Sequence, residues 1–297
     1  MVMLIQVLLP VLLIFAAGFL GQKIFKLHIK SLTTTALYLM TPPLIFRTFY
    51  TAKLDAGYLN ILVYSLVLSA VLIAVIKIVS SWRKYSSVQA GALISSAAFM
   101  NNGNFGAPLM LFAYGQAAFD YAIAIMVLHA IVMSTVGLYY VARGNFNVKK
   151  SLISVAKMPI VHAVYIGLLW QYLHLPLPEN IYSAVSMVAD ASIILTMLAL
   201  GMQLAEIKLV KIQWDLASIG ILVRLFLSPA IAYILTLLLP VEPMLAKVMI
   251  ILGAMPSAAI MVMYSIEFDC EPQLVSSITL LSTLFSILTL SVLLTVL

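Results

Sequence analysis

Long apolar stretches alternate with short polar connections along the whole chain. A helix needs about 20 consecutive, mostly apolar residues to cross the hydrocarbon core of a bilayer. Ten stretches meet that requirement, so the pattern predicts an all-α membrane protein with ten transmembrane spans. The predicted spans cover residues 2–22, 31–50, 57–79, 88–112, 117–141, 152–173, 181–205, 214–239, 244–265 and 273–297.

The fourth predicted span is interrupted by the run Met100–Pro108, which contains three asparagines, two glycines and a proline. Glycine and proline weaken or break a helix, and unpaired backbone groups are costly in hydrocarbon. A broken helix is therefore expected only where it lines a protected cavity, as at the substrate site of a transporter. The alternative is a kink that allows close packing of neighbouring helices.

The residues of this break are suited to an anion. Pro108 can begin the second half-helix, because a proline at that position loses no hydrogen bond. The N–H groups and the dipole at the start of a helix attract negative charge. Asn101, Gly103 and Asn104 precede this half-helix and form, together with Pro108, the candidate substrate site. Their neighbour Asn102 is expected to face another side and to contribute less.

The ninth predicted span has a second break at Gly253–Ala259, where Pro256 and Ser257 are the candidate binding residues. If the two breaks cross, two positive helix ends face one cavity. Close packing of the glycine and alanine residues is the alternative here as well.

The two breaks belong to a wider repetition between the halves of the chain. Because each half holds five spans, an odd number, the second copy would enter the membrane upside down. The sequence thus predicts an inverted repeat of residues 1–145 and 151–297, which is typical of secondary transporters; chance coincidence of common residues is the alternative. Pro10 and Gly18 recur as Pro159 and Gly167 (shift 149), Gly103 and Pro108 as Gly253 and Pro256 (shifts 150 and 148), and Ser134-Thr135 as Ser282-Thr283 (shift 148).

Charge predicts the orientation and excludes some functions. The chain is 64% hydrophobic and 9% charged, with 16 basic residues. Twelve of the 16 fall in connections on one side and three on the other, so the positive-inside rule places both termini outside. The twelve are Lys23, Lys26, Lys30, Lys77, Arg83, Lys84, Arg143, Lys149, Lys150, Lys157, Lys208 and Lys211, and the three are Arg47, Lys53 and Lys247.

The net charge of +6 is therefore mainly a topology signal, and no nucleic-acid partner is expected. The single cysteine, Cys270, excludes an intrachain disulfide and a cysteine metal cluster, and no cofactor or metal is expected. The apolar N-terminus is interpreted as a first span and not as a cleaved signal peptide. We find no sequence motif of a membrane enzyme.

Four ionisable residues lie deep inside predicted spans, away from the span ends, where such residues suggest a function. Asp190 could bind a proton or cation, or form a structural pair. Arg224 could attract an anion, or pair with Asp190 at an interface between domains. His129 and His162 are expected to pack against carbonyl groups.

Several motifs resemble the auxin efflux carrier family, and the resemblance extends over essentially the whole chain. The run Asn101–Leu109 is similar to the family's span-four break. The other matching motifs are Pro43-Leu44-Ile45-Phe46, Asp190-Ala191 followed by Gly201, Arg224–Ala230, Met255-Pro256 and Pro272–Ser276.

The resemblance implies ten spans in two inverted repeats, with crossed broken helices in spans four and nine. It implies a scaffold of spans one, two, six and seven, and a moving transport domain of the other six. It also implies small organic anions as substrates, either auxin-like acids or dicarboxylates. On the scaffold side, Pro43 and Gly201 would complete the pocket formed by the two breaks.

We therefore expect a secondary transporter that exports a small organic anion by elevator-type alternating access. One alternative is a sodium- or proton-coupled symporter similar to the bile acid:sodium symporter family, and another is a membrane sensor that transports nothing. Expected partners are the anion, the lipid bilayer and a second copy bound through scaffold helices. The expected location is a prokaryotic cytoplasmic membrane.

Overall fold

The computed structural model describes residues 2–52, 56–142, 149, 153, 155–207 and 212–297. Within these residues the protein is helical and contains no strand, which confirms the predicted all-α class. Five basic residues used for the orientation lie outside the described residues: Lys53, Arg143, Lys150, Lys208 and Lys211.

Six helical segments are long and apolar enough to cross a membrane, and the count of ten spans stays a prediction. The six are Val7–Phe25, Gly57–Trp82, Gln116–Val141, Glu179–Glu206, Trp214–Leu238 and Pro272–Val296. The predicted fourth and ninth spans are not continuous helices, because each contains the expected break.

The helices follow the predicted apolar stretches. The first part of the chain forms α1 (Val2–Phe25), α2 (Ile29–Thr34), η1 (Thr35–Met40), α3 (Thr41–Thr51), α4 (Ala56–Trp82), α5 (Ser87–Ala98), η2 (Asn102–Gly106), α6 (Ala107–Tyr114), α7 (Gln116–Val132), η3 (Met133–Gly137) and α8 (Leu138–Val141). The second part forms α10 (Pro159–Tyr172), α11 (Glu179–Glu206), α12 (Trp214–Leu222), η4 (Val223–Leu227), α13 (Ser228–Leu238), α14 (Pro243–Gly253), α15 (Ile260–Glu267) and α16 (Pro272–Val296).

Three of the π-helical turns, η1, η2 and η4, end shortly before a proline. Pro42, Pro108 and Pro229 each occupy the second position of the α-helix that follows. Proline supplies no N–H to the preceding turn, so the hydrogen-bond pattern must change there, and a widened turn is one way to do so. These irregular turns therefore have a local cause in the sequence.

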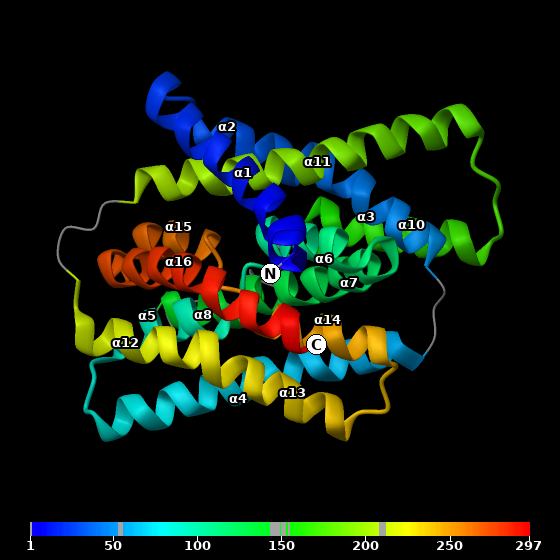
Figure 1. Ribbon diagram of the computed structural model, residues 1–297. Coiled ribbons are helices and arrows are strands. Elements are labelled where there is room, and N and C mark those ends of the chain that lie inside the picture. The colour runs from blue at the N-terminus through cyan, green and yellow to red at the C-terminus, as the bar shows by residue number, and fades with distance from the viewer. Residues whose placement is uncertain (1, 53–55, 143–148, 150–152, 154, 208–211) are drawn as a thin grey trace.

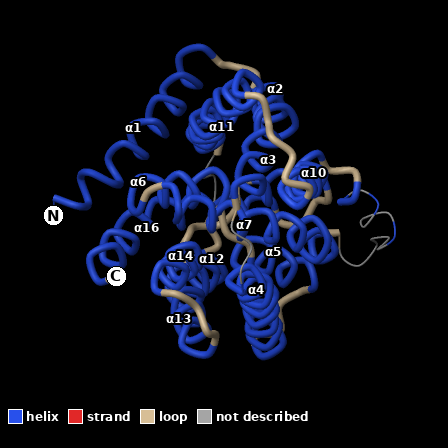
Figure 2. The backbone as a smooth tube through the Cα atoms, turned by 90° about the vertical axis from the view of Figure 1, so that its right-hand side faces the viewer, coloured by secondary structure: helices blue, strands red, loops and turns tan. Residues whose placement is uncertain are grey.

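The helices form two groups. The first group contains α1, α2, η1, α3, α10 and α11, which lie in the upper part of Figure 1. Its strongest pairings are α1 with α11 and α3 with α10. The second group contains α4 to α8 and α12 to α16 with η2, η3 and η4, and Figure 2 shows the same division from the side.

Glycines allow the backbones of the first group to approach closely. A Cβ atom on Gly18 of α1 would lie 2.2 Å from the carbonyl oxygen of Leu198 in α11. A Cβ atom on Gly201 of α11 would lie 2.0 Å from the carbonyl oxygen of Phe15. No side chain fits at either position, so these glycines determine how tightly α1 and α11 pack.

Candidate functional site

The two breaks meet and satisfy each other's backbone. Met100 and Ser257 form an isolated antiparallel bridge between the segments. The N–H of Asn101 donates to the carbonyl oxygen of Pro256 at 2.9 Å, and the N–H of Ala258 donates to that of Phe99 at 3.0 Å. These bonds replace the helical hydrogen bonds that the breaks lose, which explains how unwound backbone is tolerated here.

Asn101 caps the turn that follows the first break. Its side-chain oxygen accepts a hydrogen bond from the N–H of Asn104 at 3.3 Å, and its carbonyl oxygen accepts one from Gly106 at 3.0 Å. Asparagine is among the residues preferred at such a position. Pro108 follows in the first turn of α6, where its missing N–H costs nothing.

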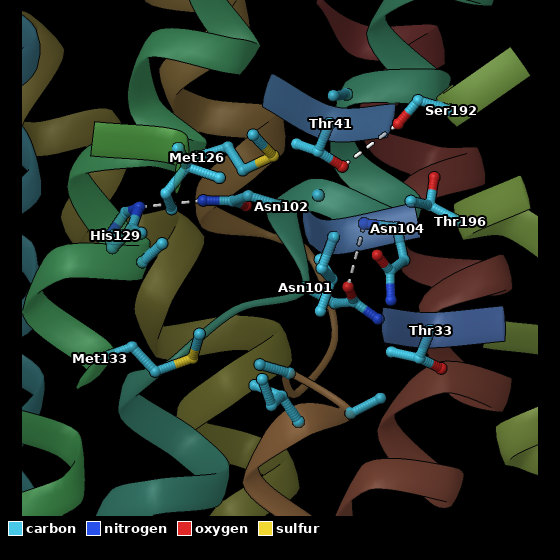
Figure 3. A pocket seen from close by; sticks show the side chains of 18 of the residues that line it. Thr33, Thr41, Asn101, Asn102, Asn104, Met126, His129, Met133, Ser192 and Thr196 are labelled. Atoms are coloured by element: carbon cyan, nitrogen blue, oxygen red, sulfur yellow. Dashed lines mark hydrogen bonds between the residues drawn. The ribbon is translucent and has the colours of Figure 1, made fainter. Parts of the chain in front are cut away.

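A cavity of about 210 Å³ lies against the first break, between the two helix groups. Four predicted site residues line it, namely Asn101, Gly103, Asn104 and Pro108. Asn102 lines it too, although the sequence suggested that this residue faces another side. Figure 3 shows the three asparagines beside side chains from α2, α3, α7 and α11.

Five residues that line this cavity have buried polar atoms with no hydrogen-bond partner. Asn102 Nδ2 donates to Nδ1 of His129 at 2.9 Å, but Oδ1 of Asn102 and Nε2 of His129 have no partner. Nearly all buried polar groups in proteins are paired, so a cluster of exceptions suggests a place for a ligand or water. The five atoms are Thr33 Oγ1, Asn101 Nδ2, Asn102 Oδ1, His129 Nε2 and Gln203 Oε1.

The other walls are hydroxyl-bearing or apolar. Thr41 donates to the carbonyl oxygen of Ala36 at 2.8 Å and lies 3.1 Å from the hydroxyl of Ser192. Among the described residues, no Asp, Glu, Lys or Arg lines the cavity. Five methionines do, and such flexible side chains adapt to ligands of varied shape. They are Met100, Met126, Met133, Met158 and Met263.

Four other predicted site residues lie outside the lining. Ser257 is fully buried, where its hydroxyl accepts from Thr279 and its N–H donates to Ser282, each at 3.2 Å. Pro256 contributes a carbonyl oxygen to the crossing of the breaks.

The two candidates from the first helix group also lie outside the lining. Pro43 lies in the first turn of α3, between Thr41 and Leu44, which do line the cavity. Gly201 packs against α1, as described above.

The two charged candidates have separate partners. Asp190 of α11 forms an ion pair with Arg47 of α3, with 2.8 Å between Oδ1 and NH1. Arg224 of η4 is fully buried and donates to the carbonyl oxygens of Ala97 at 3.0 Å and Gly253 at 2.5 Å. It also donates to the hydroxyl of Ser228. Asp190 and Arg224 thus do not pair with each other in this conformation. His162, another ionisable residue of the predicted spans, is exposed.

A second hollow lies where α3, α7 and α11 meet. It is lined by Arg47, Thr48, Thr51, Gln116, Asp120 and Tyr182. Asp120 of α7 accepts a hydrogen bond from Gln116 at 2.8 Å. Across the described residues, no cluster of His, Cys, Asp and Glu has the arrangement of a metal site.

Comparison with known proteins identifies the family. The family model described as membrane transport protein matches residues 3–151 and 145–294. An uncharacterized transporter of Methanocaldococcus jannaschii is 24% identical over 299 residues, which is 95% of this chain and 95% of that protein.

Two plant proteins match shorter parts of the chain. Auxin efflux carrier component 2 of Oryza sativa subsp. japonica is 24% identical over 43% of this chain and 21% of its own length. Auxin efflux carrier component 8 of Arabidopsis thaliana is 25% identical over 40% of this chain and 34% of its own length. The chain therefore belongs to the membrane transport protein family that includes the auxin efflux carriers, and it is a transporter, not an enzyme.

Proposed function

We propose that the protein is a secondary transporter that exports a small organic anion by elevator-type alternating access. The observation that carries this proposal is the cavity beside the first break, where Asn101, Asn102 and His129 have unpaired polar atoms. A carboxylate in this cavity could accept hydrogen bonds from the amide of Asn101 and the imidazole of His129. The start of η2 and α6 would add the positive end of a helix dipole.

The lining favours an anion with an apolar body. No charged side chain lines the described part of the cavity, so one carboxylate would have to be stabilised by amides and N–H groups alone. A second carboxylate would find no cationic partner there. The methionines and the rings of Tyr38, Phe119 and Tyr264 would surround the rest of the molecule.

The architecture that we propose is ten spans in two inverted repeats, residues 1–145 and 151–297. Support comes from corresponding helix contacts, because α1 packs on α11 as α10 packs on α3. Gly18 and Gly167, 149 positions apart, both lie at these contacts; a Cβ atom on Gly167 would lie 2.9 Å from the carbonyl oxygen of Phe46.

The two helix groups correspond to the scaffold and the transport domain of this proposal. Residues of both groups line the cavity: Thr41 and Ser192 belong to the first group, and Asn101 and His129 to the second. A substrate bound there would touch both groups. A displacement of the second group along the first would therefore carry the substrate site across the membrane. The outside location of both termini, the prokaryotic cytoplasmic membrane and the homodimer through scaffold helices stay predictions.

Flux measurements in proteoliposomes test the proposal. A monovalent anion moving without a coupled cation gains about 2.3 kcal/mol per 100 mV, enough to sustain a gradient of roughly fiftyfold. Carboxylate flux should therefore change with a potassium–valinomycin potential and stay the same when a sodium gradient is imposed. Uptake that requires sodium or a pH gradient would favour the coupled symporter. Absence of flux for every carboxylate that binds would favour the sensor.

A further inference from the structure

Arg224 holds the two broken helices together from a position outside the cavity lining. Its side chain is fully buried in the second helix group. One guanidinium nitrogen donates to the carbonyl oxygen of Ala97, in the last turn of α5, and another to that of Gly253, the last residue of α14. These are the helices that end at the two breaks. The guanidinium therefore bridges both C-terminal helix ends.

The charge of this side chain is balanced without a carboxylate. In the part of the chain that the structure describes, no carboxylate forms an ion pair with Arg224, and Asp190 pairs with Arg47 instead. A buried charge is very costly unless it is compensated. Each helix C-terminus carries a partial charge of about −0.5, so two such ends offset about one positive charge. The partial negative charges at the ends of α5 and α14 thus compensate the positive charge of Arg224.

The oxygens around the guanidinium have the chemistry of a cation site. Besides the carbonyls of Ala97 and Gly253, Arg224 contacts the hydroxyl oxygen of Ser228. That hydroxyl itself donates to the carbonyl oxygen of Gly253 at 2.7 Å, so the oxygens lie close together. Hard cations are bound in proteins by carbonyl and other oxygen ligands. Without the guanidinium, a small cation would find these oxygens in a buried, electronegative place.

We propose that Arg224 is a tethered cation, which occupies the position where a free coupling cation would otherwise bind and makes transport independent of sodium. This inference rests on the proposed function, because it concerns how that transport is energised. A free cation can bind on one side and dissociate on the other, and so contributes its gradient. The guanidinium stays attached to η4 and moves with the second helix group, so it contributes none.

Thermal unfolding of the purified protein tests the inference without any substrate. Arg224→Ala should be less stable than wild type in a buffer whose only cation is the large N-methylglucamine. Sodium or guanidinium, at equal ionic strength, should raise the unfolding temperature of this variant much more than that of wild type. Arg83→Ala is the matched control, because it removes an exposed positive charge at the end of α4 and should not respond to these cations.

Two further variants keep the test decisive. Arg224→Lys retains a tethered charge and should remain insensitive to sodium. Adding Ser228→Ala to Arg224→Ala removes one of the oxygens and should weaken the rescue by sodium. An equal sodium response in the Lys variant, an undiminished rescue in the double variant, or no response in Arg224→Ala would each overturn the inference.

Flux in proteoliposomes gives the functional readout. In N-methylglucamine, Arg224→Ala should transport at least about tenfold more slowly than wild type, the factor expected for one lost charge-assisted hydrogen bond. Sodium or guanidinium should restore much of the rate. Sodium dependence of the wild type would refute the tethered cation. If the wild type moved no anion, the proposed function would fail, while the unfolding experiment would still decide the role of Arg224.

Discussion

Replacing Asn101 separates the two roles that the structure gives to one side chain. Its Oδ1 caps η2 by accepting from the N–H of Asn104 at 3.3 Å, while its Nδ2 is unpaired in a residue that lines the cavity. Losing a helix cap costs about 0.5–2 kcal/mol of stability. We expect a value near the lower end, because 3.3 Å is longer than most N–H···O bonds.

The expected effect on binding is larger. A hydrogen bond to a charged group contributes about 1.5–3 kcal/mol, so Asn101→Ala should lower the affinity for the carboxylate about ten- to a hundredfold. Asn101→Asp adds a further distinction. An aspartate can still cap the turn, but it replaces the donor by a negative charge. Because Asn101 is buried and no cationic side chain of the described residues lines the cavity, the new carboxylate should itself lower the stability. The affinity of this variant for the substrate carboxylate should be lower still.

Calorimetric titration with the carboxylate that most stabilises the wild type would measure both variants. Ser86→Ala provides a matched control, since Ser86 caps α5 in an exposed position by accepting from the N–H of Gln89 at 3.2 Å. It should lose a little stability and keep its affinity. Wild-type affinity in Asn101→Ala, or equal affinity in Asn101→Asp and wild type, would show that this amide does not contact the substrate.

Other parts of the structure give further predictions. Gly201→Ala should lower stability by about 1–3 kcal/mol in a thermal unfolding assay, because its Cβ atom would overlap the backbone of α1. Gly21→Ala is the control: beyond the neighbouring residues of its own helix, its Cβ atom would meet no atom within 4 Å, so the same assay should show no loss of stability. Asp190→Asn should cost less than about 1 kcal/mol, because the side chain of Asp190 is 66% exposed. It should also keep the voltage response of carboxylate flux. Loss in this variant of a proton dependence that the wild type shows would instead assign a coupling role to Asp190. A reporter fused after Leu297 should be inactive if it requires the cytoplasm, since the distribution of basic residues predicts that both termini lie outside.

The first break could be predicted because helix breakers act locally. Asn101, Gly103 and Pro108 interrupt an apolar stretch, and their effect on the backbone does not depend on distant contacts. The structure has the break at this position, with η2 and α6 beginning at Asn102 and Ala107. The lining of one cavity by Asn101, Gly103, Asn104 and Pro108 follows from their closeness in sequence.

The opposite wall could not be predicted in the same way. Thr41 lies in α3, far along the chain from Ser192 and Gln203 in α11 and from the first break. A single hydroxyl or amide in an apolar helix does not reveal which neighbour it faces. The partners of Arg224 are harder still to predict. They include two backbone carbonyls, and a free carbonyl at a helix end has no residue type that marks it in a sequence.

The pattern of hydrogen bonds favours movement between the two helix groups. Within the second group, Asn102 bonds to His129 and Tyr64 donates to the carbonyl oxygen of Met249 at 2.5 Å. Within the first, Arg47 pairs with Asp190. Where the groups meet, the rings of Phe15 and Phe105 pack edge to face, 5.0 Å between centroids. Apolar contacts are not directional, so a shift would exchange such contacts while each group keeps the bonds within it. In the elevator-type movement that we propose, the crossed breaks would therefore travel as a unit with their backbone still paired.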